Sequence, residues 1–234
     1  MANAVLMASG LGSRMRPLTN TKPKPLIEVC GTPMIETVIN ALSKQGVENI
    51  YIVVGYLGDQ FSYMTEKYDN VSIIKNKDYE TINNISSIYY AREVLKTSDV
   101  YICEADLYIS DENILKKVDT GKSGYCGIMV EGHSDDWVFE QNEDEYITRV
   151  GKVGDDCYNM CGLSYFKQDK AMMIAEEIER VYGKQGQYEE LFWDDAVNSI
   201  VDRLDLVVFP VDANQIVEID TVAELEEVNK RLSK

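Results

Sequence analysis

The chain has 234 residues, of which 45% are hydrophobic and 27% are charged, a balance typical of one globular domain. Its formal net charge of −17 argues against nucleic-acid binding, because phosphate backbones are bound by basic patches. No apolar stretch approaches the ~18 residues of a membrane span. The apolar run at residues 4–8 is too short for a signal peptide, so we expect a cytoplasmic protein with no membrane partner.

The first half of the chain alternates strand and helix patterns. Residues 4–8 form an apolar run that ends near Gly10, as a buried strand entering a turn should. A helix is expected to open at Thr32 and Pro33 and to stop at Gly46. Further strands are expected at 50–54, 71–74 and 100–103, and further helices at 61–68 and 87–96. This rhythm predicts an α/β fold, a single Rossmann-like domain whose central, mostly parallel mixed sheet is flanked by helices.

The second half is predicted to extend the sheet with strands joined by polar turns. Short strands are expected at 124–130, 138–141, 146–150 and 162–166. Helices at 170–182 and 188–202 follow, with a hinge at 183–187, and then strands at 206–209 and 217–219. Thr221 and Glu224 form a capping box for the last helix, whose inward face is expected to be Val222, Leu225, Val228 and Leu232. No linker divides the chain, so we expect one domain over residues 1–234.

The first 27 residues are basic in an otherwise acidic chain. Arg14, Arg16, Lys22 and Lys24 lie there without a single Asp or Glu. A chance gap of acids would explain such a segment. A compact polyanion such as a nucleoside triphosphate would also be attracted to it.

Two glycines follow the first strand inside this basic segment. Gly10 and Gly12 leave room for backbone N–H groups to approach phosphate oxygens. A bare Gly-x-Gly mostly marks a turn, and neither the dinucleotide fingerprint nor a Walker A loop is completed here. The longer string at residues 7–19, with Pro23 and Lys24, is more specific. It resembles the signature of the sugar-phosphate nucleotidyltransferase superfamily.

Four further stretches resemble one branch of that superfamily, the phosphocholine and 2-aminoethylphosphonate cytidylyltransferases. They are residues 53–57 with Phe61, 83–87, 192–195 and 218–220. The resemblance implies a nucleotidyltransferase type A-like fold that binds CTP through residues 1–110 and the acceptor through residues 111–234. It also implies Mg²⁺ as cofactor and a small zwitterionic amino-phosphonate or amino-phosphate as acceptor. The sugar branches usually carry other motifs where this chain has Asn83 and Asn84, which makes a sugar phosphate the weaker alternative.

The resemblance places CTP against the first half, and cytosine preference follows from the resemblance only. Arg14 and Lys24 are the expected catalytic cations, since a guanidinium fork and a mobile ammonium suit a triphosphate. The expected nucleotide contacts are Ala8, Gly10, Leu11, Gly12, Ser13, Arg14, Lys24, Asn83, Asn84 and Asp106.

The resemblance also assigns Mg²⁺ to two aspartates. Asp106 and Asp220 each follow a predicted strand, at the strand ends where α/β sheets bind ligands. On spacing alone, each would be a solvated loop acid or a helix cap. Glu104 and Glu218 lie two residues before them and are interpreted as supporting or surface acids.

The acceptor is expected to lie near the only two tryptophans, Trp137 and Trp193, which both stand among acidic residues. An aromatic face beside carboxylates holds an alkylammonium group, although ordinary core tryptophans are the alternative. The expected acceptor contacts are Trp137, Lys152, Glu189, Phe192, Trp193 and Asp194, with Lys152 on the phosphoryl group. The surplus of carboxylates favours a primary ammonium, which donates three hydrogen bonds, over a quaternary one. We therefore expect 2-aminoethylphosphonate in preference to phosphocholine.

Three other interpretations are less favoured. His133 is not needed as a general base, because phosphate and phosphonate oxygens are already ionised at neutral pH. Cys157 and Cys161 have no second cysteine pair with which to form a zinc site. A non-catalytic relative would be expected to have lost a phosphate-binding cation or a metal carboxylate, and both kinds are present.

Overall fold

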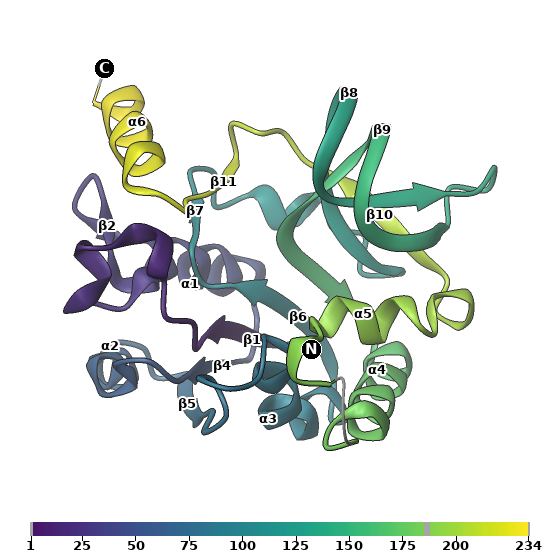
Figure 1. Ribbon diagram of the computed structural model, residues 1–234, viewed down its shortest axis with the longest axis horizontal. Coiled ribbons are helices and arrows are strands. Elements are labelled where there is room, and N and C mark those ends of the chain that lie inside the picture. Colours follow the sequence, from purple (N-terminus) through teal and green to yellow (C-terminus); the bar gives the residue numbers. More distant parts are fainter. Residues whose placement is uncertain (1, 185–187, 234) are drawn as a thin grey trace.

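The computed structural model describes residues 2–184 and 188–233, and its central feature is a seven-stranded sheet (Figure 1). In spatial order the strands are β10 (Leu206–Pro210), β8 (Ser123–Gln141), β9 (Ile147–Phe166), β6 (Asp99–Glu104), β1 (Ala2–Ala8), β4 (Asn49–Val54) and β5 (Val71–Lys75). The pairs β1–β4, β1–β6, β4–β5 and β8–β10 are parallel, whereas β9 is antiparallel to both β6 and β8. The predicted α/β fold with a mostly parallel mixed sheet is confirmed.

Helices cover both faces of this sheet. They are α1 (Met34–Gln45) and α2 (Tyr63–Lys67) on one face, and α3 (Ile85–Leu95), α4 (Gln168–Val181) and α5 (Trp193–Asn198) on the other. Side chains alternate along β1, so Leu6 packs into one core and Val5 into the other. A strand that is buried on both sides reads as a continuous apolar run, which is why the strands of the first half were predictable.

Helix α1 shows how closely the local signals determine an element. It ends where predicted, at Gly46, whose φ of 83° places the cap in the left-handed region that glycine favours. It begins at Met34, later than expected, because Thr32 and Pro33 form the short strand β3 (Thr32–Pro33). That strand pairs with β2 (Glu28–Val29).

The middle of the chain differs from the prediction. The four short strands expected there are two long ones, β8 and β9, which form a hairpin that extends at the upper right of Figure 1. The polar residues expected to be turns continue the pairing, with His133 opposite Asp155 and Trp137 opposite Lys152. Several register shifts along the hairpin allow it to bend.

The C-terminal third also needs correction. The helix expected at 188–202 is broken into a 3₁₀ turn at Tyr188–Glu190, helix α5, and a second turn at Val201–Arg203. Of the expected hinge, residues 185–187 lie outside the described residues. The strand β11 (Ile216–Glu218) pairs with β7 (Leu107–Ile109) and leads to α6 (Val222–Leu232). The capping box of α6 is present, but Leu232 is exposed rather than inward. In the described residues, no helix is long and apolar enough to cross a membrane.

Candidate active site

A cavity of about 920 Å³ lies beyond the carboxyl ends of β1 and β6. Ligands bind at this edge of open α/β sheets, where successive strand ends present their side chains together. Its wall is drawn from residues 7–25, 76–87, 104–106, 135–162, 192–194 and 218–224. Both halves of the chain therefore contribute to one cavity.

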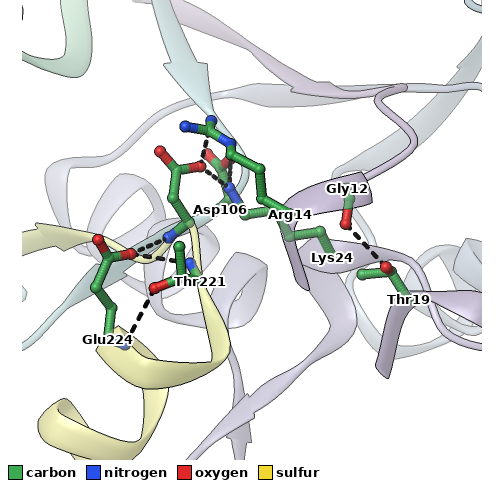
Figure 2. Close-up of polar contacts among 8 residues, drawn as sticks. Gly12, Arg14, Thr19, Lys24, Asp106, Thr221 and Glu224 are labelled. Carbon is green, nitrogen blue, oxygen red and sulfur yellow. Dashed lines mark hydrogen bonds and ion pairs between the residues drawn. The ribbon is translucent and has the colours of Figure 1, made fainter. Parts of the chain in front are cut away.

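The turn after β1 packs closely on Lys24. Gly12 has a φ of +59°, and a Cβ there would lie 3.0 Å from both Lys24 Cβ and Thr19 Cγ2. The Thr19 hydroxyl donates a hydrogen bond of 2.8 Å to the Gly12 carbonyl (Figure 2). Gly12 thus allows the turn to approach Lys24, while Gly10 faces open space.

Lys24 joins three distant parts of the chain. Its ammonium donates to Asp106 Oδ2 and to Asp220 Oδ1, each at 2.5 Å, and Arg14 donates to Asp220 Oδ1 at 2.7 Å (Figure 2). Burial alone would lower the pKa of the Lys24 ammonium, but the two carboxylates outweigh it, and the net pKa is raised. The two expected metal ligands are thereby brought to one point.

Carboxylates are concentrated on this side of the cavity. Oxygens of Glu104, Asp106 and Glu218 lie within 4.8 Å of one another. Burial, followed by repulsion from Asp106, raises the pKa of Glu104 well above its usual range and that of Glu218 to about 8. A cation would relieve this repulsion. Hard oxygen donors at such density fit a divalent ion such as Mg²⁺.

Glu104 and Glu218 were interpreted from the sequence as supporting or surface acids. Both line the cavity beside Asp106 and Asp220. Each is the last residue of its strand, β6 or β11, and an aspartate follows two residues later, so this recurring offset is the signal that could have selected them.

An aromatic pair lies on another wall. The rings of Trp137 and Phe192 meet edge to face at 5.3 Å. The Lys152 ammonium lies 5.7 Å from the Trp137 ring centre and 5.6 Å from that of Phe192. Lys152 therefore already supplies a cation to both rings.

Asp194 is a buried acid close in sequence to Phe192. It lines the cavity, is 3% exposed, and accepts a hydrogen bond of 3.1 Å from the Tyr125 hydroxyl. Burial raises the pKa of Asp194 to about 7, although the Tyr125 hydrogen bond lowers it. No local pattern could indicate this pairing, because the partners are 69 residues apart.

Most of the expected site residues surround the cavity. All ten expected nucleotide contacts line it, as do Asp220, Trp137, Lys152, Phe192 and Asp194. Glu189 and Trp193 do not. Trp193 is 3% exposed and packs against Tyr125 and Phe166 in the core, so it supports the wall from behind. Lining residues that were not expected from the sequence include Ser9, Asn76, Tyr79, Ser86, Ser87 and Met160.

Comparisons with known proteins agree with this geometry. The profile of the MobA-like NTP transferase domain family matches residues 4–187. The chain is 52% identical to 2-aminoethylphosphonate cytidylyltransferase of Lancefieldella rimae, over 95% of this chain and 90% of that protein. It is 33% identical to choline-phosphate cytidylyltransferase of Streptococcus pneumoniae, over 97% and 98% of the two chains. The solved structure of the CTP:phosphocholine cytidylyltransferase from that organism superposes with a TM-score of 0.89, at 31% identity and 99% coverage of both chains.

Proposed function

This chain belongs to the MobA-like NTP transferase domain family, and from that premise we propose that it transfers CMP from CTP to 2-aminoethylphosphonate. One observation carries the proposal. A single cavity is lined by the glycine turn with Arg14 and Lys24, by the carboxylate cluster, and by Asp194 with the Trp137–Phe192 pair. The identity of 52% with a cytidylyltransferase that carries this acceptor in its name supports the choice of substrate. The products are CMP-2-aminoethylphosphonate and pyrophosphate.

The nucleotide half, residues 1–110, is proposed to hold the triphosphate. Gly10 leaves the backbone N–H groups of the turn open to phosphate oxygens, and Arg14 and Lys24 face the same space. Arg14 is exposed and free to leave Asp220 for a phosphate, whereas buried Lys24 is fixed in place. Charge on the departing pyrophosphate grows during the reaction, so these cations favour the transition state over the bound substrate.

The chemical step is in-line attack by a phosphonate oxygen on the α-phosphorus of CTP. One P–O bond forms there as the bond to the bridging oxygen of pyrophosphate breaks. The attacking oxygen is already ionised at neutral pH, so no side chain must remove a proton. What the chain supplies is alignment of two anions and neutralisation of their charge.

Mg²⁺ is the proposed cofactor, held by Asp106 and Asp220 with Glu104 and Glu218 beside them. When bound, it would neutralise phosphate oxygens that otherwise repel the acceptor. The carboxylate cluster supports this choice, since it offers only hard oxygen ligands.

The acceptor half, residues 111–234, is proposed to bind the zwitterion by its two charges. Lys152 suits the phosphonate while its ammonium stays beside the Trp137 and Phe192 rings, and Asp194, with Asp135 and Asp136 also in the wall, suits the acceptor's ammonium. A quaternary ammonium depends on free aromatic faces, but here the Trp137–Phe192 pair already holds the Lys152 ammonium. A primary ammonium instead needs hydrogen-bond acceptors, which this wall has in surplus.

Phosphocholine is the second candidate acceptor. It is favoured by the likeness to the pneumococcal enzymes and by the presence of an aromatic pair in the wall. The two candidates share the nucleotide, the metal and the transfer of CMP, and they differ in the ammonium group that Asp194 and the rings must recognise and in whether a phosphonate or a phosphate oxygen attacks.

The test is pyrophosphate release by the wild-type protein with each of four nucleoside triphosphates and three acceptors, with and without Mg²⁺. The acceptors are 2-aminoethylphosphonate, phosphocholine and glucose 1-phosphate. We expect turnover that requires CTP and Mg²⁺ and is fastest with 2-aminoethylphosphonate. Turnover confined to glucose 1-phosphate, or to a purine nucleotide, would refute the proposal.

A further inference from the structure

Asn83 and Asn84 lie between β5 and α3, at the rim where the nucleotide half meets the segment 188–193. They were expected among the nucleotide contacts. Their side chains are instead bonded to the backbone of that segment, which carries Phe192 and leads into Asp194.

Three hydrogen bonds make this connection. The Asn83 backbone N–H donates to the Glu189 carbonyl at 2.8 Å, and Asn83 Nδ2 donates to the Glu190 carbonyl at 3.1 Å. Asn84 Oδ1 accepts from the Trp193 backbone N–H at 2.9 Å. Trp193 is the first residue of α5, so its N–H has no partner within the helix. Asn84 therefore caps α5 from a distant part of the chain.

The same two residues are tied to the phosphate-binding turn. The Asn83 carbonyl accepts from Ser86 Oγ at 2.8 Å, and Ser87 Oγ donates to Ser9 Oγ at 3.3 Å. Asn76 joins the two serines, because its Nδ2 donates to Ser86 Oγ at 2.8 Å and to Ser87 Oγ at 3.5 Å. Ser9 follows β1 directly and lines the cavity, so a hydrogen-bonded network runs from the nucleotide end to the acceptor wall.

We infer that Asn84, supported by Asn83, is a positioning residue for the acceptor, which holds Phe192 and Asp194 over the nucleotide through the Trp193 backbone. The inference rests on the proposed function, in which those two side chains contact the acceptor. Its rival is direct reading of cytosine by Asn84 Nδ2, for which residues 2–184 and 188–233 provide no hydrogen-bond partner. The two roles use different atoms of one side chain, so substitution can separate them.

Two substitutions of similar size distinguish the positioning role from direct reading of cytosine. Asn84→Asp keeps an oxygen for the Trp193 N–H and removes the Nδ2 donor, whereas Asn84→Leu removes both. We expect Asn84→Leu to raise the acceptor KM about tenfold and to speed amide exchange across 188–193, the effect of losing one cap. CTP affinity measured by calorimetry without acceptor should stay within about twofold of wild type, which also shows that the variant is folded. Asn84→Asp should restore acceptor KM and exchange toward wild type.

Opposite results would overturn the inference. Loss of CTP affinity in both variants, with exchange across 188–193 unchanged, would assign Asn84 to the base. Unchanged acceptor KM and exchange in Asn84→Leu would also refute a positioning role. If the wild-type protein fails to use 2-aminoethylphosphonate, the proposed function fails, but the exchange and CTP-affinity measurements still decide what Asn84 does.

Discussion

Lys24 is the residue at which the beginning, middle and end of the chain meet. Its two carboxylate partners lie 82 and 196 positions away in the sequence, yet both are 2.5 Å from its ammonium. Removing one partner leaves a buried cation incompletely paired, so substitutions here affect charge more than packing. The proposed metal carboxylates can therefore be tested by isosteric replacement.

Asp106→Asn keeps the size of the side chain and removes its charge. We expect turnover with CTP and 2-aminoethylphosphonate at saturating Mg²⁺ to fall about 10³-fold, or about 4 kcal/mol of transition-state stabilisation. Glu112→Gln is the matched control, because Glu112 is an exposed acid that pairs only with Lys44, at 3.4 Å, among the described residues. An Asp106→Asn protein that keeps more than a tenth of wild-type turnover would contradict the role given to Asp106.

Asp194 predicts a pH dependence of acceptor use. With its pKa raised to about 7, the carboxyl is mostly protonated at about pH 6 and mostly ionised at about pH 8, and only the ionised form attracts an ammonium. The kcat/KM for 2-aminoethylphosphonate should therefore rise between those values. The acceptor's own phosphonate also titrates, but it does so equally with every variant.

Two variants isolate the contribution of Asp194 to this pH dependence. Asp194→Asn should lower kcat/KM and lose the part of the pH dependence that Asp194 supplies. Tyr125→Phe removes the hydrogen bond that lowers this pKa, so it should move the midpoint to higher pH. Identical profiles for wild type, Asp194→Asn and Tyr125→Phe would show that Asp194 does not face the ammonium.

At the scale of elements, the glycine turn is constrained by packing. Gly12→Ala would place a methyl group 3.0 Å from Lys24 Cβ in a left-handed conformation, which costs ~1–2 kcal/mol before any clash. We expect Tm to fall by roughly 2–8 °C, since each kcal/mol shifts a domain of this size by ~2–4 °C. Gly10→Ala is the comparator for stability, because a Cβ on Gly10 would have no heavy atom within 4 Å and the φ there is not positive. Equal melting temperatures for the two variants would refute this account of the turn.

How far the sequence predicted each element depended on burial. The strands β1, β4 and β6 lie between helices, so their apolar runs were unambiguous. Between residues 128 and 137, β8 is largely exposed, and its polar residues resembled a turn. Pairing with β9 holds that stretch extended, and such long-range pairing leaves no local pattern.

The residues of the candidate site also divide into those that the sequence predicted and those that it did not. Lys24 and Asp106 were expected from the resemblance of their motifs to a known family, and both line the cavity. The inward direction of Trp193 could not be predicted from the sequence, because α5 has only six residues and shows no clear periodicity. The use of Asn84 as a cap was also hidden, since its partner is 109 residues away.

At the scale of the whole molecule, one sheet carries the binding elements that are proposed for the two substrates. β6 comes from the proposed nucleotide half, β9 from the proposed acceptor half, and their antiparallel pairing joins the two in a single layer (Figure 1). In the proposed function the fold itself brings the reacting groups together, and the contacts of Lys24, Asn83 and Asn84 are additional links between the two halves. We therefore expect specificity for the acceptor to depend on the wall that β8, β9 and α5 build.

A competition assay tests the central claim most directly. Wild-type protein is given CTP and Mg²⁺ with equal concentrations of 2-aminoethylphosphonate and phosphocholine, and the two products are followed in one tube by ³¹P NMR. Their initial ratio equals the ratio of the kcat/KM values. We predict that CMP-2-aminoethylphosphonate forms at least about tenfold faster than CDP-choline, because the wall offers acids to a primary ammonium while Lys152 occupies the aromatic pair. An excess of CDP-choline would contradict this account of the acceptor site.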